Sequence, residues 1–508
     1  MHGSGGPGTR PLNRRRRDAP DEPAPPSPIA AKPPRAHTLG GRHGMPPAEV
    51  PADRLQPGIP GVDGFPVKLT YLGHAALMAE AGGRRLLMDP WLEDPGYLGA
   101  WWHFPPLAQG LEDLGPVDYV YCSHDHPDHF DPKTLRRLPR STRFLVPRFT
   151  SAVLERRYAE LGFTNLIPLE FGRTLELEGG MRVTCYRTDL VWEDSALVVE
   201  ADGAALFDQN DCKLGDEKLA EIAGRHAIDI AFLPFSGAIQ FPTCYTMPEK
   251  RKRALCAERR RGHLESLARR VQRLRPRHVV PFAGNFCLPA PDQLWMNEIN
   301  NINTPGDAVE WLAREVPEAV ALQMNPGDTW SPALGLERLR PAPRWEDRLR
   351  LVEQLAAQWA PRIEAYRAAE RPARATLRTE ARAYFARLAA QHAELPGRID
   401  ATVIVEVSGP QGDVFTLRYA RSGLEIADGA ASEWSMRMTV PDTILQQLVD
   451  GDVSWDEALI SFRLWFDENP EFFNEPFWAM LYSPGPEFMQ EYLRFDRPPA
   501  PACAGEGA

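Results

Sequence analysis

Long apolar runs are missing from this sequence, which has no stretch of about 18 or more apolar residues, the usual length of a membrane-spanning helix. Its N-terminus also lacks the apolar core of a secretory signal peptide. Cysteine is scarce: the 508 residues include seven, widely spaced and without a Cys-x-x-Cys pair. These absences predict a cytoplasmic protein with reduced thiols and no membrane span.

Positive charge is not in excess either, because 58 Lys and Arg against 69 Asp and Glu leave a net charge of -11. Nucleic-acid binding generally uses a positive surface, so we expect no nucleic-acid partner. The one strongly basic segment, residues 248–275, has a helical pattern. We interpret it as a solvated helix face, and the alternative is a rim that attracts an anionic substrate.

The length predicts two or three domains. Residues 1–65 are rich in Pro, Gly and Arg and predict a disordered tail, in which Met45 is a second candidate start. A metal-binding domain is expected at residues 66–335, a helical linker at 336–397 and a small α/β C-terminal module at 398–495. The module contains no cluster of His, Cys and acidic residues, and its residues 455–466 predict a helix.

The segment at residues 121–131 packs three histidines and three carboxylates into eleven residues, directly after a short apolar strand. Four of its side chains are good metal ligands at the spacing His-x-His-x-Asp-His: His124, His126, Asp128 and His129. Imidazole and carboxylate together suit zinc, iron or manganese. The pattern therefore predicts a metal site on a loop at the end of a strand.

Other polar residues also follow predicted strands. His74 and Asp89 each come at a strand end, where they either line the site or serve as ordinary turn residues. The loop at residues 188–194 carries three acids, and Asp211 lies in a second acidic stretch; both could also be acidic turns. Residues 95–110 form an aromatic loop long enough to cover a pocket.

The His124–His129 motif resembles the signature of the metallo-β-lactamase superfamily, which implies an α/β fold with an αββα sandwich. Gly73-His74 and Asp89-Pro90-Trp91 resemble its branch of sugar-phosphate lactonases and N-acylphosphatidylethanolamine phospholipases. A closer resemblance is to the CMP-N-acetylneuraminate hydroxylases. The matching stretches include Trp101-Trp102, residues 235–238 and 281–284, and Trp455-Asp456-Glu457 of the module. The module is also similar to a sterol-carrier-type fold.

The resemblance implies roles for individual residues. His124 and His126 would bind one metal, Asp128 and His129 would serve a second metal or position water, and Asp211 would bridge the two. Two histidines usual in the family are missing. One is expected after a middle strand, where Asp189, Glu193 or Asp194 are the candidates to replace it. The other is expected near residues 282–285. Asp128, His74 and Asp89 are the predicted catalytic residues.

The hydroxylases also carry a Rieske iron–sulfur domain, which needs Cys-x-His and Cys-x-x-His pairs. No cysteine precedes Cys122, so we expect that this domain is absent and that electrons come from another protein in trans.

A ligand set rich in carboxylates suits iron and oxygen chemistry, whereas zinc hydrolases tend to use more imidazole. The leading prediction is therefore an iron-dependent oxygenase with one or two metal ions, acting on a small, polar, anionic or nucleotide-linked substrate seated under the Trp101-Trp102 loop. The alternative is a zinc or manganese hydrolase of an ester, amide or phosphodiester. A third reading, from a non-enzyme class, is a degenerate fold used for binding.

Overall fold

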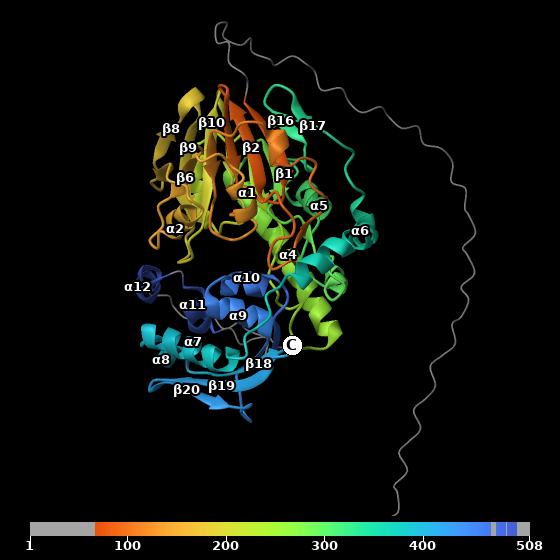
Figure 1. Ribbon diagram of the computed structural model, residues 1–508. Helices are drawn as coiled ribbons and strands as arrows, with labels where there is room; N and C mark the ends of the chain where they lie inside the picture. The colour runs from red at the N-terminus through yellow and green to blue at the C-terminus, as the bar shows by residue number, and fades with distance from the viewer. Residues whose placement is uncertain (1–66, 469–473, 484, 495–508) are drawn as a thin grey trace, which may run out of the picture. The chain divides into compact units, whose positions relative to one another are not determined.

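Two β-sheets packed face to face form the centre of the first region of the protein (Figure 1). The computed structural model describes residues 67–468, 474–483 and 485–494, and the predicted tail at residues 1–65 lies outside them. The first sheet has the order β17-β16-β1-β2-β3-β5-β6-β7. Its strands are β1 (Lys68–Gly73), β2 (Ala76–Ala81), β3 (Arg84–Met88), β5 (Tyr119–Tyr121), β6 (Arg143–Pro147), β7 (Leu166–Leu169), β16 (Thr329–Ser331) and β17 (Gly335–Glu337).

The second sheet has the order β15-β13-β12-β11-β10-β9-β8. Its strands are β8 (Thr174–Glu176), β9 (Arg182–Arg187), β10 (Ser195–Ala201), β11 (Ala204–Asp208), β12 (Ile230–Pro234), β13 (His278–Phe282) and β15 (Val320–Ala321). Buried side chains that alternate along both sheets form the core between them, among them Leu77, Leu86, Leu197 and Phe232.

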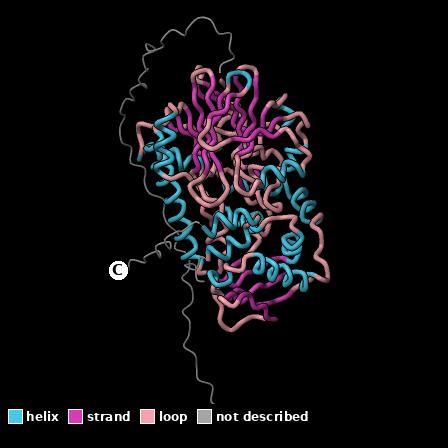
Figure 2. Tube along the Cα trace, turned by 90° about the vertical axis from the view of Figure 1, so that its left-hand side faces the viewer, coloured by secondary structure: helices cyan, strands magenta, loops and turns pink. Residues whose placement is uncertain are grey.

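Helices cover the outer face of each sheet, as Figure 2 shows. Those on the first sheet are α1 (Pro132–Arg136) and α2 (Val153–Glu160). Those on the second are α3 (Asp216–Arg225), α4 (Glu249–Leu274) and α5 (Pro305–Glu315). Helix–sheet–sheet–helix layering of this kind confirms the predicted sandwich, and the predicted basic helix is α4.

Local sequence explains where these elements begin and end. Gly82 and Gly83 have φ of 53° and 72°, which a two-residue hairpin turn between β2 and β3 requires. The Asp131 side chain accepts hydrogen bonds from the backbone N–H groups of Lys133 and Thr134, and so caps α1. The segment between β5 and α1 therefore runs from a strand paired on both sides to a capped helix.

A second region follows the two-sheet region in the chain. Helix α6 (Arg348–Ala368) packs on Trp102 and Phe104, whereas α7 (Leu377–Gln391) and α8 (Leu395–Ile399) share the core of the C-terminal module. That module has a five-stranded sheet of order β20-β19-β18-β21-β22. Its elements are β18 (Thr402–Ser408), β19 (Asp413–Ala420), β20 (Gly423–Asp428), β21 (Met436–Pro441), β22 (Trp465–Glu468), α9 (Asp442–Asp450), α10 (Trp455–Ile460), α11 (Glu475–Tyr482) and α12 (Pro486–Arg494). The linker and module boundaries stay predictions.

The predicted helix at residues 455–466 is wrong in its second half. Helix α10 ends at Ile460, Phe462 takes a left-handed conformation with φ of 57°, and β22 then pairs with β21. The amphipathic pattern did not mark this end, because the residues that follow α10 are apolar for strand packing.

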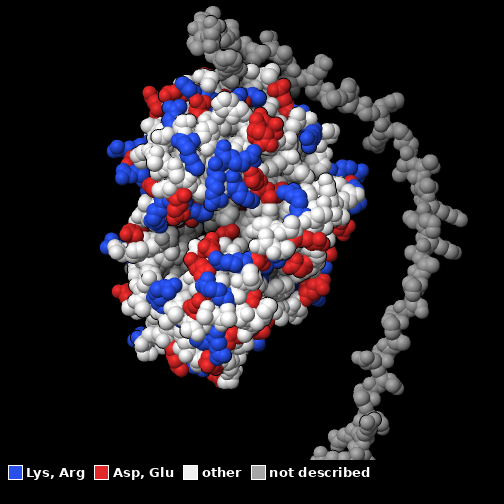
Figure 3. All heavy atoms as spheres, in the orientation of Figure 1, with Lys and Arg blue, Asp and Glu red and all other residues white. Residues whose placement is uncertain are grey.

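No helix among the described residues is both long and apolar enough to cross a membrane. The six cysteines that the structure describes are free and buried. Figure 3 shows one face of the molecule, on which groups of basic and acidic side chains are scattered among uncharged residues.

Candidate metal centre

The predicted ligands come together at one edge of the two sheets, around the loop at residues 122–131, which we call the metal loop. Two triads of potential ligands, buried except for the partly exposed Asp211, each have their ligand atoms within 4.8 Å of one another. One triad is His74, Asp128 and His129, and the other is His124, His129 and Asp211. His129 belongs to both triads through its Nε2, since its Nδ1 faces Asp89. One imidazole nitrogen binds one ion, so His129 would be a ligand at one position and a neighbour of the other.

Four non-glycine residues with left-handed backbone surround this edge. His74, Asp89, Asn210 and Ala283 have φ between 43° and 52°, and each follows the end of a strand. This conformation is unfavourable for residues with a Cβ atom and concentrates at functional sites. The Ala283 N–H donates to the His74 carbonyl, which joins the two sheets beside the cluster.

Asp128 is held between two histidines and a tyrosine. Its Oδ2 lies 2.9 Å from His74 Nε2 and 3.5 Å from His129 Nε2, and its Oδ1 accepts a short hydrogen bond from the Tyr97 hydroxyl. Burial alone would raise the pKa of Asp128, but His129 and His74 outweigh burial and hold the pKa well below its usual range. The carboxylate is thus ionised and ready to bind a cation.

Asp89 and Ser123 support the motif from behind. Asp89 Oδ2 lies 2.8 Å from His129 Nδ1, and Asp89 Oδ1 accepts the Ser123 N–H at 2.7 Å. The Ser123 hydroxyl donates to Asp89 at 2.9 Å and lies 3.0 Å from His124 Nδ1. These contacts hold two rings of the motif through their Nδ1 sides and leave His129 Nε2 facing the cluster.

Several buried atoms at the centre have no hydrogen-bond partner within the described residues. They include His129 Nε2, Asp211 Oδ1, His74 Nδ1 and Asp208 Oδ2. A buried polar atom without a partner costs about 1–3 kcal/mol. Asp211 Oδ1 and His129 Nε2 face each other at 3.4 Å, so a metal ion would satisfy both. The residues therefore fit a metal ion, by geometry and by donor chemistry.

Burial and neighbouring charges shift the pKa values of the cluster residues in different directions. Burial would lower the pKa of His129, but Asp128, Asp89 and Asp211 raise it well above its usual value. Burial would raise the pKa of Asp211, but His129 and His124 lower it. Burial, aided by the Asp89 charge, raises the pKa of Asp208 well above its usual range.

The acidic loop between β9 and β10 sends its carboxylates in three directions. Asp194 Oδ1 lies 3.3 Å from His124 Nδ1. The Glu193 carboxylate accepts from the Ser151 backbone and hydroxyl, and Asp189 accepts the Gly215 N–H at 2.7 Å. Asp194 is thus the acid of this loop that the structure places beside the motif, whereas Asp189 is exposed and belongs to neither triad.

His126 belongs to neither triad, although its ring centroid lies 4.4 Å from that of His124. Its Nε2 lies 3.7 Å from Asp456 Oδ2 of helix α10, in the C-terminal module. Burial would lower the pKa of His126, but Asp456 raises it to about 9. Sequence analysis missed Asp456, although it lies in the Trp455-Asp456-Glu457 stretch that carried part of the family resemblance.

The aromatic loop does not cover an open pocket in the way that we expected. Trp101 and Trp102 are 1% and 0% exposed. Trp101 stacks on Phe286 with ring centroids 3.5 Å apart and lies edge-on to His74 at 5.7 Å. Trp102 lies in β4 (Trp102–His103), which pairs with β14 (Phe286–Cys287). Both indoles therefore pack as core residues, Trp101 beside the cluster and Trp102 against Trp359 of α6.

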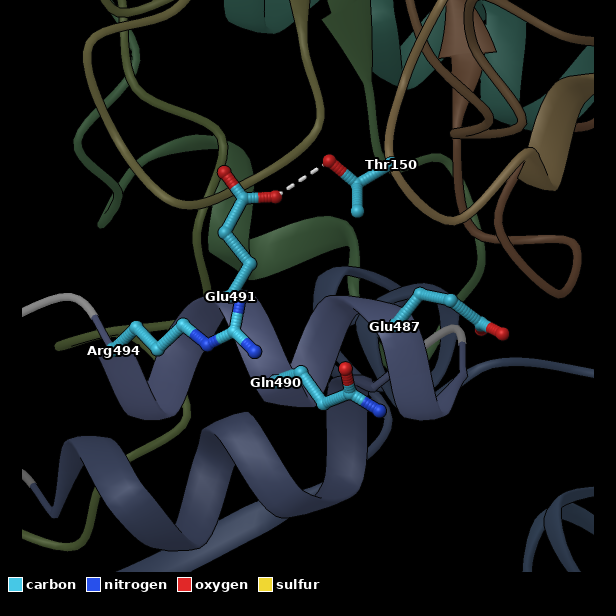
Figure 4. A pocket seen from close by; sticks show the side chains of 5 residues that line it. All are labelled: Thr150, Glu487, Gln490, Glu491 and Arg494. Carbon is cyan, nitrogen blue, oxygen red and sulfur yellow. Dashed lines mark hydrogen bonds between the residues drawn. The ribbon is translucent and has the colours of Figure 1, made fainter.

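A cavity of about 430 Å³ lies between helix α12 and the segment after β6 (Figure 4). The Thr150 hydroxyl donates to Glu491 across it at 2.6 Å. Its lining residues are Thr150, Glu487, Gln490, Glu491 and Arg494. None of them belongs to the triads, but Ser151, next to Thr150, binds the carboxylate of Glu193, the neighbour of Asp194.

Comparison with known proteins supports the superfamily that the histidine motif resembles. Residues 84–282 match the family model described as "Beta-lactamase superfamily domain". A protein of Mycobacterium tuberculosis named as a Rieske 2Fe-2S iron-sulfur protein is 32% identical over 243 residues, which is 46% of each chain. The cytidine monophosphate-N-acetylneuraminic acid hydroxylase of Danio rerio is 28% identical over 286 residues, 53% of this chain and 47% of that protein.

Among solved structures, CmlA of Streptomyces venezuelae, a diiron β-hydroxylase, is similar at 22% identity with a TM-score of 0.38. The similarity covers 52% of this chain and 54% of CmlA.

The region at residues 84–282 is thus a domain of the beta-lactamase superfamily, as the histidine motif predicted. The homologues of the chain include the hydroxylases that the sequence resembles. The chain spans about half the length of the curated relatives it matches.

Proposed function

We propose that this protein is a metal-dependent oxygenase that hydroxylates a small polar substrate and holds two metal ions, with iron favoured. The observation that carries the proposal is the pair of triads that meet at His129, with two facing, buried atoms left unpartnered. Relatives named as hydroxylases support the reaction type. The abundance of carboxylate around the motif supports iron over zinc.

In this proposal, His124, His129 and Asp211 would hold one ion, and His74, Asp128 and His129 would lie around the other. His74 then stands near the place of the family histidine that residues 282–285 lack. The ions, when bound, would supply activation of O2 in a site from which water is largely excluded.

The protein's own side chains orient the candidate metal ligands and close one side of the site. Tyr97 donates to Asp128 Oδ1 and thereby directs Oδ2 toward His74 and His129. Asp89 holds the Nδ1 side of His129, so its Nε2 stays aimed at the cluster. Trp101, packed against His74 and Phe286, closes the side of the site that the sequence analysis assigned to the substrate.

Hydroxylation inserts one atom of O2 into a C–H bond and releases the other as water, which consumes two electrons and two protons. We infer that the electrons come from a separate electron-transfer protein. The relatives named as Rieske iron–sulfur proteins support that inference.

The test begins with anaerobic purification and loading with Fe(II). The enzyme then receives a chemical reductant, ¹⁸O2 and candidate substrates, starting with CMP-linked sugars because of the relatives' names. A product heavier by one ¹⁸O atom supports the proposal. His129→Ala provides the negative control, and Asp202→Asn, in the exposed turn between β10 and β11, provides the matched control. Turnover with zinc in the absence of O2 would overturn it.

A second candidate function is hydrolysis of an ester, amide or phosphodiester by zinc or manganese. The observation in its favour is the ionised Asp128 beside His74, which suits the orientation of a nucleophilic water. Hydrolysis of model esters and phosphodiesters by the zinc-loaded, anaerobic protein distinguishes this function from the first.

A further inference from the structure

Each of the three motif histidines has a ring nitrogen beside a carboxylate, and the carboxylate beside His126 comes from outside the sandwich. Asp89 lies 2.8 Å from His129, and Asp194 lies 3.3 Å from His124. His126 instead meets Asp456 of α10, at 3.7 Å between Nε2 and Oδ2. Both partners of this last pair are partly exposed, at 28% and 30%.

Two hydrogen bonds hold the C-terminal end of helix α10 in place near the metal loop. The Trp101 indole N–H donates to the Ile460 carbonyl at 2.9 Å, and the Gln293 side chain donates to the Ser461 carbonyl at 2.7 Å. Trp101 is the same side chain that packs against His74. The metal cluster and α10 thus share a rigid, buried intermediate.

The other side of α10 is fixed within the module. Trp455 is 2% exposed and its indole N–H donates to the Tyr384 hydroxyl at 2.9 Å. The Ser454 side chain caps the helix by accepting the Glu457 N–H. Asp456, between these two anchors, has little freedom to move away from His126. Figure 1 shows α10 on the side of the module that faces the two sheets.

We propose that Asp456 is a positioning residue of the metal centre, through which the C-terminal module orients the ligand His126. Metal-binding histidines almost always turn their second ring nitrogen to a carboxylate or carbonyl group, which fixes the ring and its tautomer. Asp456 occupies that place for Nε2 of His126 and leaves Nδ1 for the metal. This inference rests on the proposed function and adds His126, whose ring centroid lies 4.4 Å from that of His124, to the side chains around the first ion.

The inference gives the module a part in the chemistry, although it has no metal-binding group of its own among the described residues. Metal binding and docking of the module then support each other. The domain without the module is expected to hold its metal more weakly than the full chain.

The experiment uses the full chain, freed of metal by a chelator and titrated with Co(II), whose visible absorption reports ligand geometry. Asp456→Ala is expected to weaken binding about 10–100-fold and to change the Co(II) spectrum. Asp456→Asn keeps an oxygen acceptor of the same shape, so it should recover part of both. The matched control is Asp452→Asn, an exposed carboxylate of the same module that pairs with Arg371.

Unchanged affinity and spectrum in both Asp456 variants would overturn the inference while leaving the metal site intact. Loss of one bound ion per chain in both variants would make Asp456 a ligand, which also overturns it. If the wild-type chain binds no metal, the proposed function fails instead. Thermal melting of the metal-free variants checks the fold, and Asp456→Asn keeps the test decisive if Asp456→Ala does not fold.

Discussion

The metal loop and helix α4 are both rich in ionisable side chains, but the surroundings of those side chains differ. In the metal loop, His129 is fully buried among three carboxylates, which raise its pKa. On α4, burial together with the positive charges of Arg259, Lys213 and Arg270 lowers the pKa of His263 to about 4. The same residue type is therefore held charged at one place and neutral at the other.

The difference shows that the effect of a charged segment depends on which groups its side chains contact. Five of the eight arginines of α4 are exposed, and two of these pair along the helix, Arg253 with Glu249 and Arg261 with Glu265. Such pairs contribute little. The metal loop instead buries charges against one another and leaves ligand atoms unpartnered, a costly arrangement that binding a metal would relieve.

The largest expected effect comes from His129→Ala. This side chain belongs to both triads, so we expect metal affinity to fall by more than about 100-fold, beyond the effect of an outer residue. Elemental analysis of the purified protein measures it, with Asp202→Asn as the control. Full metal content in His129→Ala would contradict the role of His129 as a ligand.

Asp89→Asn is the next test, because it keeps the shape of the side chain and removes its charge from behind His129. We expect metal affinity to fall about 10–100-fold without loss of the fold. Competition with a chelating dye gives the affinity, and circular dichroism checks the fold. If Asp89→Asn binds like the wild type, Asp89 does not orient His129.

The pH dependence of stability tests the other half of the comparison. The pKa of His263 is about 4 in the folded chain and about 6.5 in an unfolded one, so the unfolded state binds more protons between these values. The free energy of unfolding should therefore rise with pH across this window, by up to about 3 kcal/mol.

Urea unfolding from pH 4.5 to 7.5 measures this rise. In His263→Gln, the slope of the free energy of unfolding with pH should be smaller, by the equivalent of up to one bound proton. Above pH 7 the curves for the two proteins should run parallel. An equal slope in both proteins at pH 5–6 would show that His263 is not held neutral.

The smallest effect is expected from Arg261→Ala on α4. Its guanidinium pairs with Glu265 at 2.8 Å, with both side chains at least half exposed. We expect a change of about 0.5 kcal/mol or less in the free energy of unfolding, and no change in metal content. A loss of metal in this variant would show that the basic helix supports the site.

Much of the sandwich and of the metal loop could be predicted from local pattern. Alternating apolar residues and Gly82-Gly83 marked the β2–β3 hairpin, and the spacing from His124 to His129 marked the ligands. The end of α10 was missed, because an apolar segment that continues from a helix into a strand gives no local stop signal. The buried packing of Trp101 was missed too, since exposure depends on what other segments bring against it.

The sequence by itself determined which side chains share the metal loop, because four candidate ligands within six residues at a strand end must lie together. Only the tertiary structure decided what completes the cluster. It placed Asp194 beside His124, Asp189 against Gly215 and His74 beside Asp128. Spacing along the chain governs neighbours on one loop, whereas long-range packing of sheets and modules governs which loops meet.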